Sequence, residues 1–238
     1  MMSQQVKLTV TRSMPEEAVV VEGLPGVGLV GGIAASYIIH QLGMELSGYV
    51  ESPHLPPVAM LQQGIARHPF RIYTKDRLVV LYSEVPVAPV HVHELSRRIA
   101  EWAHGIGASQ VITLAGIPSP MREPAVYGVA ADEEAVRYLR EHGINVLEEG
   151  VVSGMPGQVL LDCAKLGMTA FCLLAQTPGM NPDPAGAAEL IKVLNRLHGL
   201  EINVEPLLRE AKEIEAKMEE LAKQTRKMKQ QETLPMFY

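Results

Sequence analysis

The sequence contains few cysteines, few aromatic residues and no excess of basic charge. Its 238 residues include two cysteines, and aromatic residues make up 5% of the chain. Cys163 and Cys172 are too few for a disulfide framework and lack metal-ligand spacing, so they predict buried, reduced thiols. The formal net charge of -6 argues against a nucleic-acid-binding surface. We therefore expect no nucleic-acid partner.

The chain also lacks an apolar run long enough to cross a bilayer. The most apolar N-terminal stretch, from Leu29 to Ile39, is too short to span a membrane and contains Gly31 and Gly32. No charged segment followed by a cleavage site precedes it. These features predict a cytoplasmic protein without a membrane partner.

Apolar residues are abundant enough for one substantial core. Hydrophobic residues make up 47% of the chain and charged residues 20%, which is typical of a globular protein. We predict a core domain over residues 1–204, a charged C-terminal helix over residues 205–231, and an apolar tail over residues 232–238.

Runs of β-branched residues alternate with helical patterns through the predicted core. Such alternation predicts an α/β fold with a mostly parallel sheet flanked by helices, plus a hairpin-rich insertion near residues 55–85. Asp132 and Asp183 are expected to cap two of the helices. The expected strands are Ala18–Val21, Leu46–Val50, Val58–Gln62, Phe70–Thr74, Leu78–Ser83, Gln110–Leu114, Asn145–Leu147 and Met168–Leu174, and the expected helices are Leu29–Leu42, His91–His104, Asp132–Glu141, Val159–Lys165 and Pro184–His198.

A glycine-rich turn joins the first of these strands to the first helix. Within Gly23 to Gly32, the residues Gly26, Gly28 and Gly31 fit the G-x-G-x-x-G pattern of dinucleotide sites. Glu51, at the end of the next strand, is the acid that would then bind ribose hydroxyls. The favoured interpretation is a tight turn that packs the helix closely on the sheet, and nucleotide binding is the alternative.

Other polar residues do not form a catalytic constellation in the sequence. His91 and His93 with Glu94 offer possible metal ligands, but a spacing of two at a helix start points the two imidazoles apart. No G-x-S-x-G surrounds Ser36 or Ser153. The sequence therefore predicts a protein that is not an enzyme and holds no metal or cofactor.

The C-terminal region has the pattern of a charged helix with one narrow apolar seam. The remaining faces are rich in Glu, Lys and Arg, and the helix would reach about 40 Å. Pro235 prevents this helix from continuing to the terminus. The alternative is a helix packed on its own domain with a frayed end. The seam consists of Leu207, Ala211, Ile214, Met218, Leu221, Thr225 and Met228.

Five segments spread along the predicted core have distinctive glycine- and proline-containing patterns: Val21–Val30, Gly116–Pro120, Val126–Ala130, Gly150–Gly157 and Asn181–Ala188. In this order they resemble signatures of the proteasome assembly chaperone family in its archaeal branch. The resemblance implies an α/β domain related to the purine nucleoside phosphorylase fold, no established enzymatic activity, and self-assembly into homo-oligomers. It also implies that the proteasome α subunits are partners, with or without a second family member.

The same resemblance assigns a role to the tail Leu234-Pro235-Met236-Phe237-Tyr238. Family members and proteasome activators carry a C-terminal hydrophobic-Tyr-any motif that enters pockets between α subunits, where the terminal carboxylate meets a lysine. Here Met236 would be the hydrophobic residue, Phe237 the aromatic residue, and Tyr238 the terminal residue. Phe237 departs from the motif because it lacks the phenol hydroxyl. The competing hypotheses are a nucleotide- or nucleoside-binding enzyme that uses the Gly23–Gly32 turn, and a scaffold for another partner.

Overall fold

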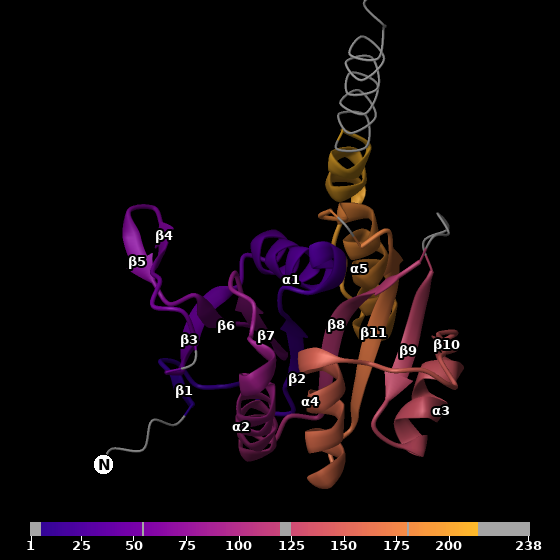
Figure 1. The fold of residues 1–238 in the computed structure, drawn as a ribbon, viewed down its shortest axis with the longest axis horizontal. Helices are drawn as coiled ribbons and strands as arrows, with labels where there is room; N and C mark the ends of the chain where they lie inside the picture. The colour runs from indigo at the N-terminus through magenta and orange to yellow at the C-terminus, as the bar shows by residue number, and fades with distance from the viewer. Residues whose placement is uncertain (1–5, 54, 120–124, 180, 214–238) are drawn as a thin grey trace, which may run out of the picture.

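Alternating β-branched and helical segments fold into one nine-stranded sheet with helices on both faces (Figure 1). The computed structural model describes residues 6–53, 55–119, 125–179 and 181–213. The main sheet contains β1 (Lys7–Val10), β2 (Val19–Gly23), β3 (Glu45–Glu51), β6 (Phe70–Lys75), β7 (Leu78–Ser83), β8 (Gln110–Pro118), β9 (Val126–Ala130), β10 (Asn145–Val146) and β11 (Ala170–Thr177). The helices are α1 (Val30–Gln41), α2 (Val92–Gly105), α3 (Glu133–Glu141), α4 (Gly154–Lys165) and α5 (Pro184–His198), with short 3-10 turns η1 (Val27–Leu29) and η2 (Pro89–His91).

The sheet is mixed, with the order β1-β3-β6-β7-β2-β8-β11-β9-β10. Its centre, β7-β2-β8-β11, is parallel, whereas β1, β3, β6 and β7 pair antiparallel and β9 is antiparallel to β11. The prediction of a mostly parallel sheet is thus right for the centre and for the edge pair β9 and β10, and wrong for the other neighbours. Parallel neighbours need a crossover connection, and α2 supplies one between β7 and β8 while α3 supplies one between β9 and β10. Elsewhere the chain returns through short turns such as the one between β6 and β7.

The predicted hairpin-rich insertion divides into two hairpins with different positions. β6 and β7 form one hairpin inside the main sheet. β4 (Met60–Gln62) and β5 (Ile65–Arg67) form a separate two-stranded hairpin, which projects beyond β3 and β6 in Figure 1. At its base the rings of Tyr49 and His68 stack at a centroid distance of 3.9 Å.

Two apolar clusters fill the layers on either side of the sheet. On one face, Ala34 and Ile38 of α1 and Leu190 of α5 are fully buried against the strands. On the other face, Ile99 of α2 and Val159 of α4 are equally buried. Because both faces are covered, the central strands carry apolar residues continuously rather than in alternation.

The predicted helix caps are confirmed, while three strands escaped prediction. The Asp132 side chain accepts a hydrogen bond from the Ala135 amide at 2.8 Å, and Asp183 accepts one from the Gly186 amide at 2.9 Å. The strands β1, β5 and β9 were not expected. α4 begins five residues before the predicted Val159, at Gly154, because Pro156 lies in its first turn, where a missing amide hydrogen leaves no bond unmade.

Candidate functional site

The glycine-rich turn holds α1 unusually close to the sheet. A Cβ atom added at Gly31 would lie 2.1 Å from the carbonyl oxygen of Leu114 in β8, and one at Gly23 would lie 2.4 Å from Cβ of Ala35. Backbone cannot move aside as a flexible side chain can, so only glycine fits at residue 31. The interpretation of the glycine-rich segment as a tight packing turn therefore explains why glycine stands at Gly23 and Gly31.

The other two glycines of the pattern behave differently from each other. Gly28 has φ 62°, and an added Cβ would lie 2.5 Å from Oγ1 of Thr177. Its carbonyl oxygen accepts a hydrogen bond from the Asp183 amide at 2.9 Å, so this glycine ties the turn to the cap of α5. Gly26 has no atom within 4 Å of an added Cβ. Thus Gly26 is the one position of the pattern that packing does not explain.

Glu51 does not lie beside this turn. It ends β3, and β6 and β7 stand between β3 and β2 in the sheet. In a dinucleotide site the acidic residue must end the strand next to the glycine turn. The role that the nucleotide-binding alternative gave to Glu51 is therefore wrong, because β6 and β7 separate β3 from β2.

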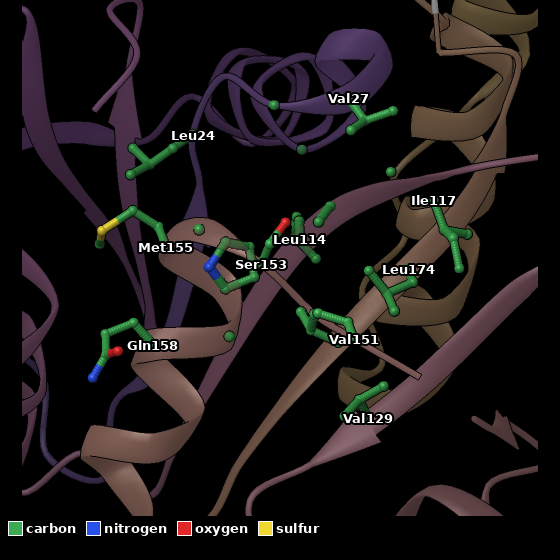
Figure 2. Close-up of a pocket in the computed structure, with 18 of the residues that line it drawn as sticks. Leu24, Val27, Leu114, Ile117, Val129, Val151, Ser153, Met155, Gln158 and Leu174 are labelled. Atoms are coloured by element: carbon green, nitrogen blue, oxygen red, sulfur yellow. The ribbon is translucent and has the colours of Figure 1, made fainter. Parts of the chain in front are cut away.

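A pocket of about 990 Å³ opens where the central strands end (Figure 2). It lies between the glycine turn, the carboxyl ends of β8 and β11, and the segment of residues 147–158 that leads into α4. Its volume falls within the range of small-molecule sites, about 300–1,000 Å³. Its apolar walls include Leu24, Val27, Leu114, Ile117, Val129, Val151, Met155 and Leu174.

Glu22 is a buried acid in the lining of this pocket. It is 1% exposed, and neither oxygen of its carboxyl group has a hydrogen-bond partner among the described residues. Burial raises the pKa of Glu22 to about 8, because the charged form loses its hydration. Across the sheet it is in register with Thr113 of β8, which is in register with Cys172 of β11.

The pocket contains acidic residues and, among the described residues that line it, neither lysine nor arginine. Glu148 and Glu149 lie exposed in the segment before α4, and Glu148 forms an ion pair with Arg140 at 3.1 Å. His93 of α2 lines the pocket from the exposed start of that helix. A phosphate group would therefore meet no lysine or arginine side chain in this lining.

The remaining candidates from the sequence lie apart from any reactive cluster. Cys163 and Cys172 are both buried and unpaired, as predicted, and burial raises the pKa of each thiol to about 12. Within the described ranges, no three His, Cys, Asp or Glu side chains are grouped so that they could hold a metal ion. None of the described helices is both long and apolar enough to cross a membrane.

The start of the C-terminal helix is fixed to the core domain. Residues 205–213 are helical, and the first two seam residues, Leu207 and Ala211, are 3% and 7% exposed. The Tyr37 hydroxyl of α1 donates a hydrogen bond to the Asn203 carbonyl oxygen at 2.8 Å. Asn195 of α5 also bonds the backbone of Ile202 in both directions. The helix therefore leaves the α1 and α5 face in a defined direction (Figure 1).

The rest of the predicted seam and all the predicted partner-binding residues lie outside the described residues. These are the seam from Ile214 onward and the tail Leu234, Pro235, Met236, Phe237 and Tyr238. The charged helix and apolar tail over residues 214–238 therefore stay predictions from the sequence.

Comparison with known proteins places the chain in one family. The model of the PAC2 family matches residues 20–222. An uncharacterized protein of Methanocaldococcus jannaschii is 36% identical over 224 residues, which cover 93% of each chain. The crystal structure of Pyrococcus furiosus PbaA, described as an archaeal homolog of proteasome-assembly chaperone, superposes with a TM-score of 0.84 at 35% identity. It covers 94% of this chain and 97% of PbaA.

A second solved structure shares the fold at lower identity. Pyrococcus furiosus PbaB, described as an archaeal proteasome activator, has a TM-score of 0.82 at 23% identity and covers 92% of this chain and 99% of its own. The match to the family model spans most of the chain, and the likeness to PbaA extends over almost all of it. The chain therefore belongs to the PAC2 family, in agreement with the resemblance to archaeal proteasome assembly chaperones noted in its sequence.

Proposed function

We propose that this protein is a non-enzymatic proteasome-binding factor, an assembly chaperone or activator, which docks its C-terminal tail into pockets of the 20S α subunits. The observation that carries the proposal is the 35% identity to PbaA across 94% of the chain, together with the apolar C-terminal residues Met236, Phe237 and Tyr238. Family membership makes the proteasome the expected partner, and the tail supplies a chemically suitable contact.

The tail can contribute only a modest affinity by itself. Burial of Met236 and Phe237 would contribute about 1.5–3 kcal/mol each. Ordering the tail and losing translational freedom cost at least about 4 kcal/mol. Several tails on one homo-oligomer would bind far more tightly, because binding of the first tail raises the effective concentration of the others. We therefore propose that the protein acts as a homo-oligomer in the cytoplasm.

The fixed start of the C-terminal helix supports this multivalent arrangement. Leu207 and Ala211 are buried, and the Tyr37–Asn203 hydrogen bond anchors the segment that precedes them. A stiff attachment holds each tail at a defined position, whereas a flexible one would lower the effective concentration. A C-terminal helix with a rigid base is thus suited to present tails to neighbouring α subunits at the same time.

Two tail variants test the proposal against purified α subunits. We expect deletion of Met236–Tyr238, or addition of one residue after Tyr238, to abolish α-subunit binding measured by pull-down and by stimulation of peptidase activity. The extension is the sharper variant, because it keeps every side chain and moves only the terminal carboxylate. The number of subunits, measured by native mass, and the melting temperature should both match those of the unaltered protein. Unchanged binding by both variants would refute tail docking.

The alternative function, nucleotide or nucleoside binding at the Gly23–Gly32 turn, has a direct test. Calorimetric titration with NAD, ATP and purine nucleosides should give no micromolar binding. The described lining of the adjacent pocket has no lysine or arginine for phosphate, and Glu51 lies beyond two other strands. Micromolar binding of any of these compounds would overturn the proposal that the protein is not an enzyme.

A further inference from the structure

Glu22 is the least explained charged residue in the described part of the core. β2 is otherwise Val-Val-Val and Gly, and a buried carboxyl group without a hydrogen-bond partner costs several kcal/mol when it is ionised. Neither α-subunit docking nor the packing of the glycine turn uses this side chain. Its position is nevertheless specific, because it is the second-last residue of a parallel strand, at the edge where ligands bind in open α/β sheets.

The walls of the pocket restrict the chemistry of a ligand. Most of the lining is apolar, so an occupant needs a hydrophobic body. The ionisable lining residues are Glu22, His93, Glu148 and Glu149. An anionic ligand would meet three carboxyl groups and no lysine or arginine in the described lining, whereas a cationic ligand would meet complementary charge.

We propose that this pocket binds a small apolar amine, whose ammonium group pairs with the carboxylate of Glu22 while its hydrophobic body lies against Leu24, Met155 and Leu174. These three residues come from the turn after β2, from α4 and from β11, and they pack on the face of the sheet that α2 and α4 cover (Figure 2). The ammonium supplies the partner that both carboxyl oxygens of Glu22 lack.

Binding exchanges a proton for the cation. In the free protein Glu22 is protonated below about pH 8, because burial raises its pKa. The ammonium pairs with the ionised form, so the complex forms as the carboxylic acid releases one proton to solvent. Affinity therefore rises about tenfold per pH unit up to about pH 8 and is constant above it, as long as the amine stays protonated.

The other groups around Glu22 do not produce this pH dependence. Cys172 of β11 faces the same layer, and its thiol stays neutral over this range because burial raises its pKa to about 12. Thr113 of β8 does not titrate. His93 of α2 and the two acids before α4, Glu148 and Glu149, remain. Glu148 is paired with Arg140, and single variants of His93 and Glu149 separate the effects of these two residues from that of Glu22.

The test uses tryptamine and its neutral isostere tryptophol, which share the indole ring and differ in one terminal group. Calorimetric titrations of the full-length protein at pH 6.5, 7.0 and 7.5 measure each Kd and, in buffers of different ionisation enthalpy, the protons released. We expect tryptamine to bind at least tenfold more tightly than tryptophol at pH 7.5, with one proton released at pH 6.5. Indole-3-acetate should bind more weakly than either.

Glu22→Gln is the decisive variant, because it keeps the shape of the side chain and removes its charge. It should bind tryptamine and tryptophol within twofold of each other and lose the pH dependence, while Glu149→Gln and His93→Gln keep at least a fivefold preference for the amine. Circular dichroism and native mass verify that each variant is folded. Equal affinity of the unaltered protein for amine and alcohol, binding of neither, or an amine preference that persists in Glu22→Gln would overturn the proposal.

Discussion

Replacement of Glu22 by Gln should stabilise the protein at neutral pH and leave it unchanged in acid. The pKa of Glu22 is about 8 in the folded protein, against an ordinary value of 4.5, because burial removes water from the charged form. The folded state therefore binds the proton more tightly than the unfolded state. The resulting stability is fully present below pH 4.5 and is lost as the pH rises toward 8.

The magnitude follows from the difference between the two pKa values. Each pH unit between them lowers the free energy of unfolding by about 1.4 kcal/mol. The loss is therefore about 3 kcal/mol between pH 4.5 and 7, and about 5 kcal/mol above pH 8. A Gln side chain cannot ionise, so the variant avoids this loss. At pH 7 it should be about 3 kcal/mol more stable, or about 6–12 °C higher in Tm for a chain of this size.

Urea denaturation of both proteins at pH 5, 6, 7 and 8 measures the effect. The quantity of interest is the difference in free energy of unfolding between Glu22→Gln and the unaltered protein, taken at one protomer concentration because self-association shifts apparent stability. This difference should increase with pH. Glu149→Gln is the matched control, since Glu149 lines the same pocket but is exposed. The free energy of unfolding of Glu149→Gln should stay within about 0.5 kcal/mol of that of the unaltered protein at every pH.

Two results would refute the reasoning. If the difference between Glu22→Gln and the unaltered protein is constant from pH 5 to 8, the carboxyl group does not titrate differently in the folded state. If the unaltered protein instead becomes more stable as the pH rises relative to the variant, Glu22 is ionised in the folded protein and has a charged partner. Either result would also remove the acid–base basis of amine binding.

Three further pairs of substitutions test other parts of the structure. Gly31→Ala should lower stability in urea denaturation by about 3 kcal/mol or more, because its Cβ meets backbone at 2.1 Å, while Gly26→Ala should cost less than about 1 kcal/mol; equal effects would contradict the packing interpretation. Leu207→Ala should cost about 2–5 kcal/mol by the same measurement, and exposed Arg209→Ala almost nothing; a negligible effect of the former would mean that the C-terminal helix is not anchored. Phe237→Ala should abolish α-subunit binding in pull-downs, whereas Phe237→Tyr should maintain or strengthen it; binding by the Ala variant would exclude an aromatic pocket contact.

Sequence periodicity and capping residues were sufficient to locate most of the helices and the central strands. The Asp132 and Asp183 caps could be read directly, because a cap depends on residues within one turn of chain. Strand direction could not be read, since it depends on which distant strand lies alongside. β1 (Lys7–Val10) pairs with β3 far along the chain, and its half-exposed pattern carries no strong signal of its own.

The candidate site was predictable only in part. The glycine turn was visible in the sequence, and so was its close packing, because glycine spacing reflects local backbone geometry. Glu22 was not identified as a functional residue. One acid at the end of a valine strand resembles a residue that faces solvent, and its burial depends on α2 and α4 covering that face of the sheet. Such coverage comes from segments about 70–140 residues further along the chain.

The separate β4–β5 hairpin has a consequence for local opening of the native state. Two strands without a third are marginally stable, and the hairpin exposes Leu61 by 78% and Ile65 by 51%. Its amides should exchange with deuterium at opening energies far below the global value, whereas the amides of β8 and β11 exchange only on complete unfolding. The tip, Gln63-Gly64, has positive φ at both residues and lies away from the sheet. A short peptide label inserted there would report on the molecule without affecting the stability of its core.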